Sequence, residues 1–107
     1  MITKTIFGIP KELKEDEYRV ALTPDSVKII TDSEHKVYIE KDAGLLSGFT
    51  NEMYVEAGAE ILDTKEEIWN KANVIIKVKE PQKAEYSFLR EDQVIFSYMH
   101  LAVEKEL

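Results

Sequence analysis

Five short apolar runs, each rich in β-branched residues, recur along the 107-residue chain and constrain its fold more than any other feature. Runs of this length and composition are typical of buried strands. They read TIFGI (5–9), KVYIE (36–40), AEIL (59–62), NVIIKV (73–78) and QVIFSYM (93–99). The segments between them are amphipathic and have the signals of helices.

Three threonines indicate where these helices begin, because a threonine side chain can cap the first turn. Thr23 precedes Pro24, a residue favoured at the first helical position, while Thr50 precedes NEMYVEA and Thr64 precedes KEEIWNKA. Strands that alternate with helices favour a parallel sheet, because a parallel connection must cross over and a helix is its usual route. We therefore predict one α/β domain over residues 1–107, with about five parallel strands and helices on both faces.

Two features, the long loops and the last residues, distinguish this domain from a compact, complete one. The loops at 10–22 and 41–50 are longer than a tight connection needs, and long loops in compact domains are often functional. The last residues, LAVEKEL (101–107), read as the start of a further helix or connection without a capped ending. We therefore expect an incomplete domain, with a sheet edge and one apolar face uncovered.

Composition excludes several classes of partner. The 14 basic and 21 acidic residues give a net charge of −7, spread along the chain, which argues against a nucleic-acid surface. There is no cysteine, so disulfides and thiolate metal sites are excluded. No apolar run approaches the roughly 20 residues of a membrane span, and the first residues do not resemble a signal peptide. We expect a cytoplasmic protein that binds a small molecule, with no metal site.

Four residues follow strands of the predicted sheet on the side where ligands bind. In open α/β sheets that side is the crevice outside the carboxyl ends of the strands. The residues are Arg19, after the first run, Lys77 and Lys79, at the end of the fourth, and His100, after the fifth. Arginine grips a carboxylate with two hydrogen bonds, lysine can polarise a carbonyl oxygen, and histidine exchanges protons near neutral pH. This set of side chains suits a keto acid or an amino acid.

The two lysines lie on the same side of their strand, so direction does not separate them. Lys79 is nearer the crevice, whereas Lys77 is nearer the strand body and can run its stem along apolar surface. Each residue also has an ordinary interpretation. Lys79 can be solvated, Arg19 can form a surface ion pair with an acid in residues 15–17, and His100 can hydrogen bond to a carbonyl at a strand end.

Four segments resemble the amino-terminal domain of alanine dehydrogenases, in the order and at the spacing of that family. They are GIPKELKEDEYRVALTP, AGLLSGFTNEMYVEAGAEI, KVKEP and MHLA, and together they extend over nearly the whole chain. The related nicotinamide nucleotide transhydrogenases share the opening and AGAEI, but usually lack the second lysine of KVKEP and the histidine of HLA. The chain departs from the family where Leu45 and Leu46 replace part of a glycine-rich loop.

The resemblance implies a Rossmann-like or flavodoxin-like sheet and an NAD-dependent oxidation of L-alanine to pyruvate and ammonia, which is reversible. It implies that Arg19 and Lys79 hold the substrate and that His100 donates and accepts protons. NAD and a catalytic aspartate would belong to a domain absent from this chain, so these 107 residues should be inactive alone. The resemblance also implies a homo-oligomer, commonly a hexamer.

The sequence is also compatible with two other functions. The chain could be the amino-terminal domain of a transhydrogenase alpha subunit, in which no amino acid is bound. It could also be a separate module that binds small carboxylates without a cofactor. KVKEP and His100 favour the dehydrogenase over the first of these.

Overall fold

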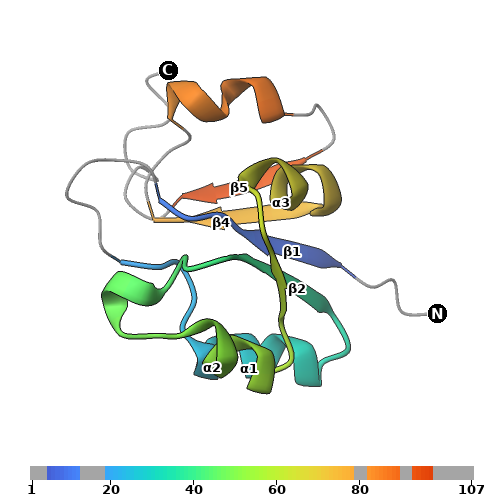
Figure 1. Cartoon of the computed structure of the whole chain (residues 1–107). Helices are drawn as coiled ribbons and strands as arrows, with labels where there is room; N and C mark the ends of the chain where they lie inside the picture. Colours follow the sequence, from blue (N-terminus) through green and yellow to red (C-terminus); the bar gives the residue numbers. More distant parts are fainter. Residues whose placement is uncertain (1–4, 13–18, 79–81, 90–92, 98–107) are drawn as a thin grey trace.

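The strands of this computed structural model form one parallel sheet in the order β3-β2-β1-β4-β5 (Figure 1). The structure describes residues 5–12, 19–78, 82–89 and 93–97. Within them the five predicted strands and their parallel pairing are confirmed. The strands are β1 (Ile6–Ile9), β2 (Lys36–Glu40), β3 (Glu60–Leu62), β4 (Val74–Lys77) and β5 (Val94–Ser97).

The three helices begin directly after the threonines that were predicted to cap them. Thr23, Thr50 and Thr64 each accept a hydrogen bond from a backbone N–H in the first turn of the helix that follows, which satisfies a donor that the helix itself leaves unpaired. The helices are α1 (Pro24–Asp32), α2 (Asn51–Glu56) and α3 (Lys65–Lys71), with 3₁₀ helices at η1 (Leu45–Ser47) and η2 (Lys83–Phe88).

Helices cover both faces of the sheet, as predicted (Figure 1). The face under α1 and α2 holds one apolar cluster, which includes Val27, Ile39 and Tyr54. The face under α3 and η2 holds a second cluster, built around Trp69 and Ile75. Because both faces of the sheet are covered over its central strands β1, β2 and β4, these strands are nearly continuous apolar runs rather than alternating patterns.

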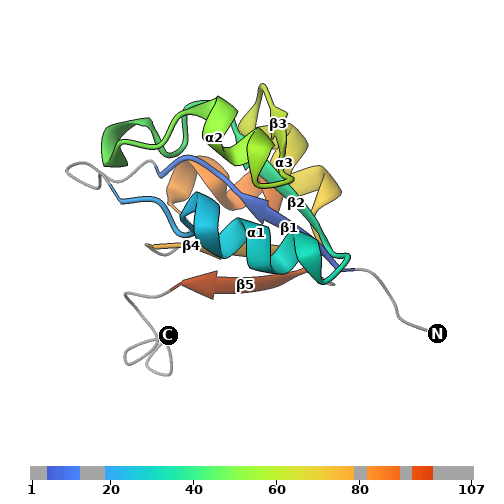
Figure 2. The same cartoon turned by 90° about the horizontal axis from the view of Figure 1, so that it is seen from below.

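The outer strand β5 is covered on one face only. Ile95 packs against the cluster under α3 and η2, whereas Val94 and Phe96 point to the other face and are 52% and 50% exposed. Figure 2, seen from the side of α1 and α2, shows β5 lying beyond α1 and not covered by it. Within the described residues the sheet therefore has the uncovered apolar face that the sequence predicted.

The described helices are also short. None of those within the described ranges is long and apolar enough to cross a membrane.

Candidate functional site at the carboxyl edge of the sheet

The strand order reverses between β1 and β4, which places the expected crevice outside the carboxyl ends of these two strands. Arg19 is exposed in the segment that follows β1, and Lys77 is the last residue of β4. Lys79 and His100 lie outside the described residues. The convergence of Arg19, Lys79 and His100 on one substrate therefore stays a prediction.

Lys77 is fully buried, and its ammonium group lies between two carboxylates. Its Nζ atom is 3.2 Å from Glu12 Oε1 and 3.3 Å from Glu85 Oε1. Sequence reasoning placed only the stem of Lys77 against apolar surface, but the charged end is buried as well. Lys77 is therefore engaged within the protein rather than presented to a ligand.

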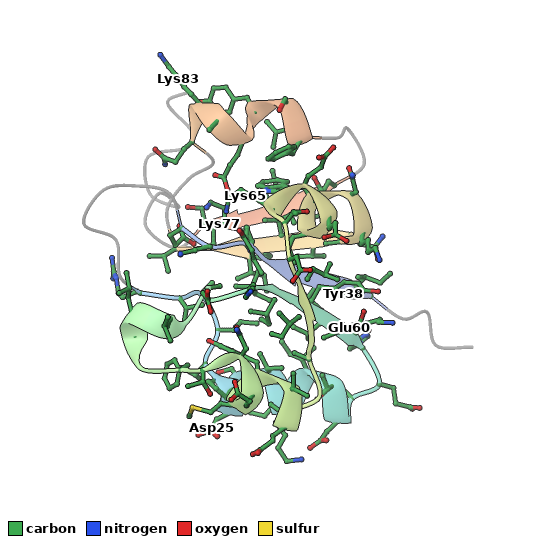
Figure 3. All side chains as sticks on the ribbon, viewed as in Figure 1. Asp25, Tyr38, Glu60, Lys65, Lys77 and Lys83 are labelled. Atoms are coloured by element: carbon green, nitrogen blue, oxygen red, sulfur yellow. The ribbon has the colours of Figure 1, made fainter. Side chains whose placement is uncertain are left out.

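A second lysine extends this arrangement along the same edge. Lys65, at the start of α3, places its Nζ atom 2.8 Å from Glu40 Oε1 and 3.7 Å from Glu85 Oε2. Figure 3 shows Lys65 and Lys77 close together below η2. We call these five residues the edge ion cluster: Glu12, Glu40, Lys65, Lys77 and Glu85.

Each carboxylate of the edge ion cluster also accepts a hydrogen bond from a backbone N–H. Glu12 accepts from Val78 at 3.0 Å, Glu40 from Lys11 at 2.8 Å, and Glu85 from Gln82 at 3.0 Å. Lys65 in turn donates to the carbonyl oxygen of Lys11. Charge-assisted bonds of this kind are stronger than neutral ones. The cluster thus ties together the chain segments that leave β1, β2 and β4.

Sequence reasoning missed the acidic members of this cluster. Glu12 precedes the acids at 15–17, and nothing in the sequence marks it as the one that lies against β4. Glu85 lies in KAEYSF, where an acidic residue reads as solvated surface. The available signal was Lys77 itself, because a charge at the end of a buried strand requires a partner of opposite charge.

Tyr54 secures the segment that carries Arg19. Its hydroxyl group donates a 2.7 Å hydrogen bond to the carbonyl oxygen of Leu22, three residues after Arg19. Burial of the ring raises the pKa of Tyr54 to about 12, because the charged phenolate would lose its solvation. The hydroxyl group therefore remains protonated, and remains a donor, across the physiological range.

The loop in which the chain departs from the family pattern folds over Tyr54. Leu45 and Leu46 form η1 and are exposed, so neither leucine enters the core. Gly44 packs so closely on Tyr54 that a Cβ atom there would lie 2.7 Å from the tyrosine oxygen. Gly48 has a φ of 90°, which favours glycine.

A hollow of about 550 Å³ lies at the opposite edge of the sheet, where α1 and α2 lead into β2 and β3. Charged side chains such as Lys28, Asp32 and Glu56 border it, and neither Arg19 nor Lys77 lines it. No group of three or more acidic or histidine side chains in the described part of the chain could hold a metal ion.

Residues 8–107 match the family model described as the alanine dehydrogenase/PNT N-terminal domain. The chain is 53% identical over 102 residues to an alanine dehydrogenase of Methanococcus maripaludis, and 47% identical over 102 residues to alanine dehydrogenase 1 of Staphylococcus aureus. Each match covers 95% of this chain and 27% of the relative. The chain therefore spans about a quarter of the length of these relatives.

Comparison with solved structures also shows similarity to alanine dehydrogenases. An L-alanine dehydrogenase superposes with a TM-score of 0.86 at 42% identity, covering 94% of this chain and 28% of that structure. A transhydrogenase from Sinorhizobium meliloti superposes with a TM-score of 0.81 at 33% identity, covering 94% of this chain and 30% of that structure. Both likenesses extend over nearly the whole of this chain, and the dehydrogenase is the more similar of the two.

Proposed function

Because this chain belongs to the alanine dehydrogenase/PNT N-terminal domain family, we propose that it is the substrate-binding segment of an NAD-dependent alanine dehydrogenase. The observation that carries the proposal is the 53% identity over 95% of the chain to a protein named alanine dehydrogenase. The higher identity to the dehydrogenase structure than to the transhydrogenase structure, 42% against 33%, supports the same choice.

Three residues of this chain would act on the substrate in the complete protein. Arg19 would pair with the carboxylate of alanine or pyruvate through two parallel hydrogen bonds. Lys79 would donate to a substrate oxygen, and its positive charge would stabilise negative charge that develops there. His100 would donate and accept the protons that the reaction consumes and releases, because histidine is the side chain type that exchanges protons near neutral pH.

NAD would be bound by a domain outside this chain. The dinucleotide pattern G-x-G-x-x-G does not occur in the 107 residues, so they do not supply the phosphate-binding turn that this cofactor needs. The residues present here would bind and orient the substrate and transfer protons. The complete enzyme would be a cytoplasmic homo-oligomer, commonly a hexamer in this family.

The test is turnover of L-alanine by the complete protein that contains this chain, followed as NADH absorbance. Lys79→Met should lower kcat/KM for pyruvate severely, and His100→Ala should lower kcat more than it weakens cofactor binding. Lys83→Met is the matched control, because Lys83 is an exposed lysine in η2 and should leave turnover at the wild-type value. Wild-type protein that does not oxidise alanine would refute the proposal.

The transhydrogenase structure supports a second candidate, since it superposes with a TM-score of 0.81. In that case the domain would serve hydride exchange between two nicotinamide nucleotides and would bind no amino acid. The two functions differ in one measurement. A transhydrogenase reduces an NADP analogue with NADH and does not respond to alanine, whereas a dehydrogenase requires alanine or pyruvate with ammonia.

A further inference from the structure

We infer that Glu12 is a positioning residue: it fixes Lys77 and the backbone of Val78 at the carboxyl end of β4, and substrate binding in the complete protein depends on these contacts. The inference deepens the proposed function and rests on it, because it gives Glu12 a role in substrate binding through Lys79. Glu12 lies in the segment after β1, and its side chain is 3% exposed.

Where the backbone pairing between β1 and β4 ends, the Glu12 side chain supplies a hydrogen-bond acceptor to the chain that continues from β4. The ladder between these strands consists of Phe7 with Val74 and Gly8 with Ile75. Beyond Ile75 the β4 backbone continues, and the Glu12 side chain then accepts the N–H of Val78 at 3.0 Å. A side-chain carboxylate therefore supplies the acceptor for a buried N–H that would otherwise be costly to leave unpaired.

The two oxygens of Glu12 engage two consecutive residues. Oε2 accepts from the Val78 N–H, while Oε1 lies 3.2 Å from the ammonium group of Lys77. Two bonds to neighbouring residues fix both the position and the direction of the strand end, which a single contact does not. Because one of the bonds is to an ammonium group, it is also stronger than a neutral hydrogen bond.

The opposite side of Val78 is held as well. Ser97, the buried last residue of β5, donates from Oγ to the carbonyl oxygen of Val78 at 3.4 Å. A side chain from the segment after β1 and one from the last residue of β5 thus hold both polar groups of the Val78 backbone. The chain continues from Glu12 toward Arg19 and from Ser97 toward His100, so the residue directly after β4 is bonded to the two segments that lead in sequence to these proposed site residues.

The experiment compares Glu12→Ala and Glu12→Gln in the complete protein. Loss of both bonds in Glu12→Ala should raise the KM for alanine about tenfold, as expected when about 1.4 kcal/mol of binding is lost. Glutamine retains an acceptor for the Val78 N–H but not the charge, so Glu12→Gln should raise this KM by a smaller factor, about threefold. The KM for NAD should stay at the wild-type value in both variants.

Thr31→Val is the matched control. It also removes a partly buried side-chain hydrogen bond to the backbone, from Thr31 Oγ1 to the Ala57 carbonyl oxygen at 2.6 Å, but at the other edge of the sheet. This variant should lower thermal stability while leaving the KM for alanine unchanged. It separates a general loss of stability from a loss of substrate alignment.

The outcomes distinguish this inference from the proposed function. A selective rise in the KM for alanine supports it. If the wild-type protein oxidises alanine but Glu12→Ala leaves the KM for alanine unchanged, the inference alone is overturned. An equal rise in the KM for alanine and in the KM for NAD overturns it as well. Wild-type protein without alanine turnover overturns the proposed function and this inference with it. If Glu12→Ala does not fold, the glutamine variant decides, and a wild-type KM in that variant overturns the inference.

Discussion

The ammonium group of Lys77 lies 3.3 Å from the carboxylate of Glu85, and both side chains are fully buried. A lysine at the end of a strand made for burial is thus explained by a carboxylate that is buried with it. Removing a charge from water is expensive, and the pair persists because each charge has a partner and further hydrogen bonds. This relation makes the carboxyl edge of the sheet sensitive to the loss of either partner.

Replacing Lys77 with methionine should lower the free energy of unfolding by about 3–5 kcal/mol, because Glu12 and Glu85 would keep buried charges without their shared lysine. Urea unfolding of the wild type and the variant measures this change. Lys28→Met is the control, since Lys28 pairs with Asp32 at 3.5 Å on the surface and such pairs contribute under about 1 kcal/mol. Equal effects of the two substitutions would show that burial of the Lys77 pairs adds nothing to stability.

The strands and helix starts could be predicted because their signals are local. Each strand is a short run of β-branched residues, and each helix has a threonine cap within a few residues of its apolar stripe. The edge ion cluster could not be predicted in the same way. Lys77 and Glu12 are 65 positions apart, and the acids near Glu12 are chemically equivalent until the fold places one of them against β4.

The order of the strands in the sheet could not be predicted from the sequence either. Alternation of strands and helices predicts a parallel sheet, but several orders satisfy that pattern. The observed reversal of strand order between β1 and β4 places the expected binding crevice at the segments that carry Arg19 and Lys77. Selection of residues by their position after a strand identified the carboxyl edge of the sheet as the candidate site, which stays a prediction, while the partners of Lys77 could be identified only from the structure.

The free energy of unfolding should decrease in alkaline solution because of Tyr54. Its pKa is raised from 10.0 to about 12 in the folded protein. Below about pH 10 both states keep the proton, whereas between about pH 10 and 12 the unfolded state loses it first, so stability decreases by up to about 1.4 kcal/mol per pH unit. Urea unfolding of wild type and Tyr54→Phe at about pH 9 and about pH 11 isolates this contribution.

In the phenylalanine variant the part of the pH dependence that belongs to Tyr54 should disappear. The variant should also be less stable by about 1–3 kcal/mol at neutral pH, because the Leu22 carbonyl oxygen loses the hydroxyl donor. Identical pH profiles for the two proteins would contradict the assignment of the raised pKa to burial of this ring.

Gly8 permits the close approach of α3 to β1. A Cβ atom at this position would lie 2.7 Å from Ala72 Cβ and 2.9 Å from Ile68 Cγ2, which is closer than such atoms pack. Gly8→Ala should therefore destabilise the protein by about 1–3 kcal/mol through overpacking, measured as a lower midpoint of urea unfolding.

A second substitution tests the cause. Ala72→Gly removes the nearer of the two obstructing atoms, so the double variant Gly8→Ala with Ala72→Gly should recover part of the loss relative to the sum of the single variants. The recovery should be incomplete because Ile68 still obstructs the new methyl group. Strict additivity of the two changes would refute a direct clash between positions 8 and 72.

The uncovered face of β5 should drive self-association of the 107-residue chain. Val94 and Phe96 expose about half of their surface on one face, and in the described part of the sheet β5 pairs with β4 alone. An apolar edge strand of this kind favours edge-to-edge contacts. Phe96→Thr, which replaces the aromatic ring with a smaller, polar residue that still favours a strand, should lower the fraction of oligomer measured by sedimentation velocity at a given concentration. Leu46→Thr is the control, because Leu46 is 68% exposed and belongs to η1 rather than to a strand. If both variants reduce association equally, general hydrophobicity rather than the β5 face is responsible.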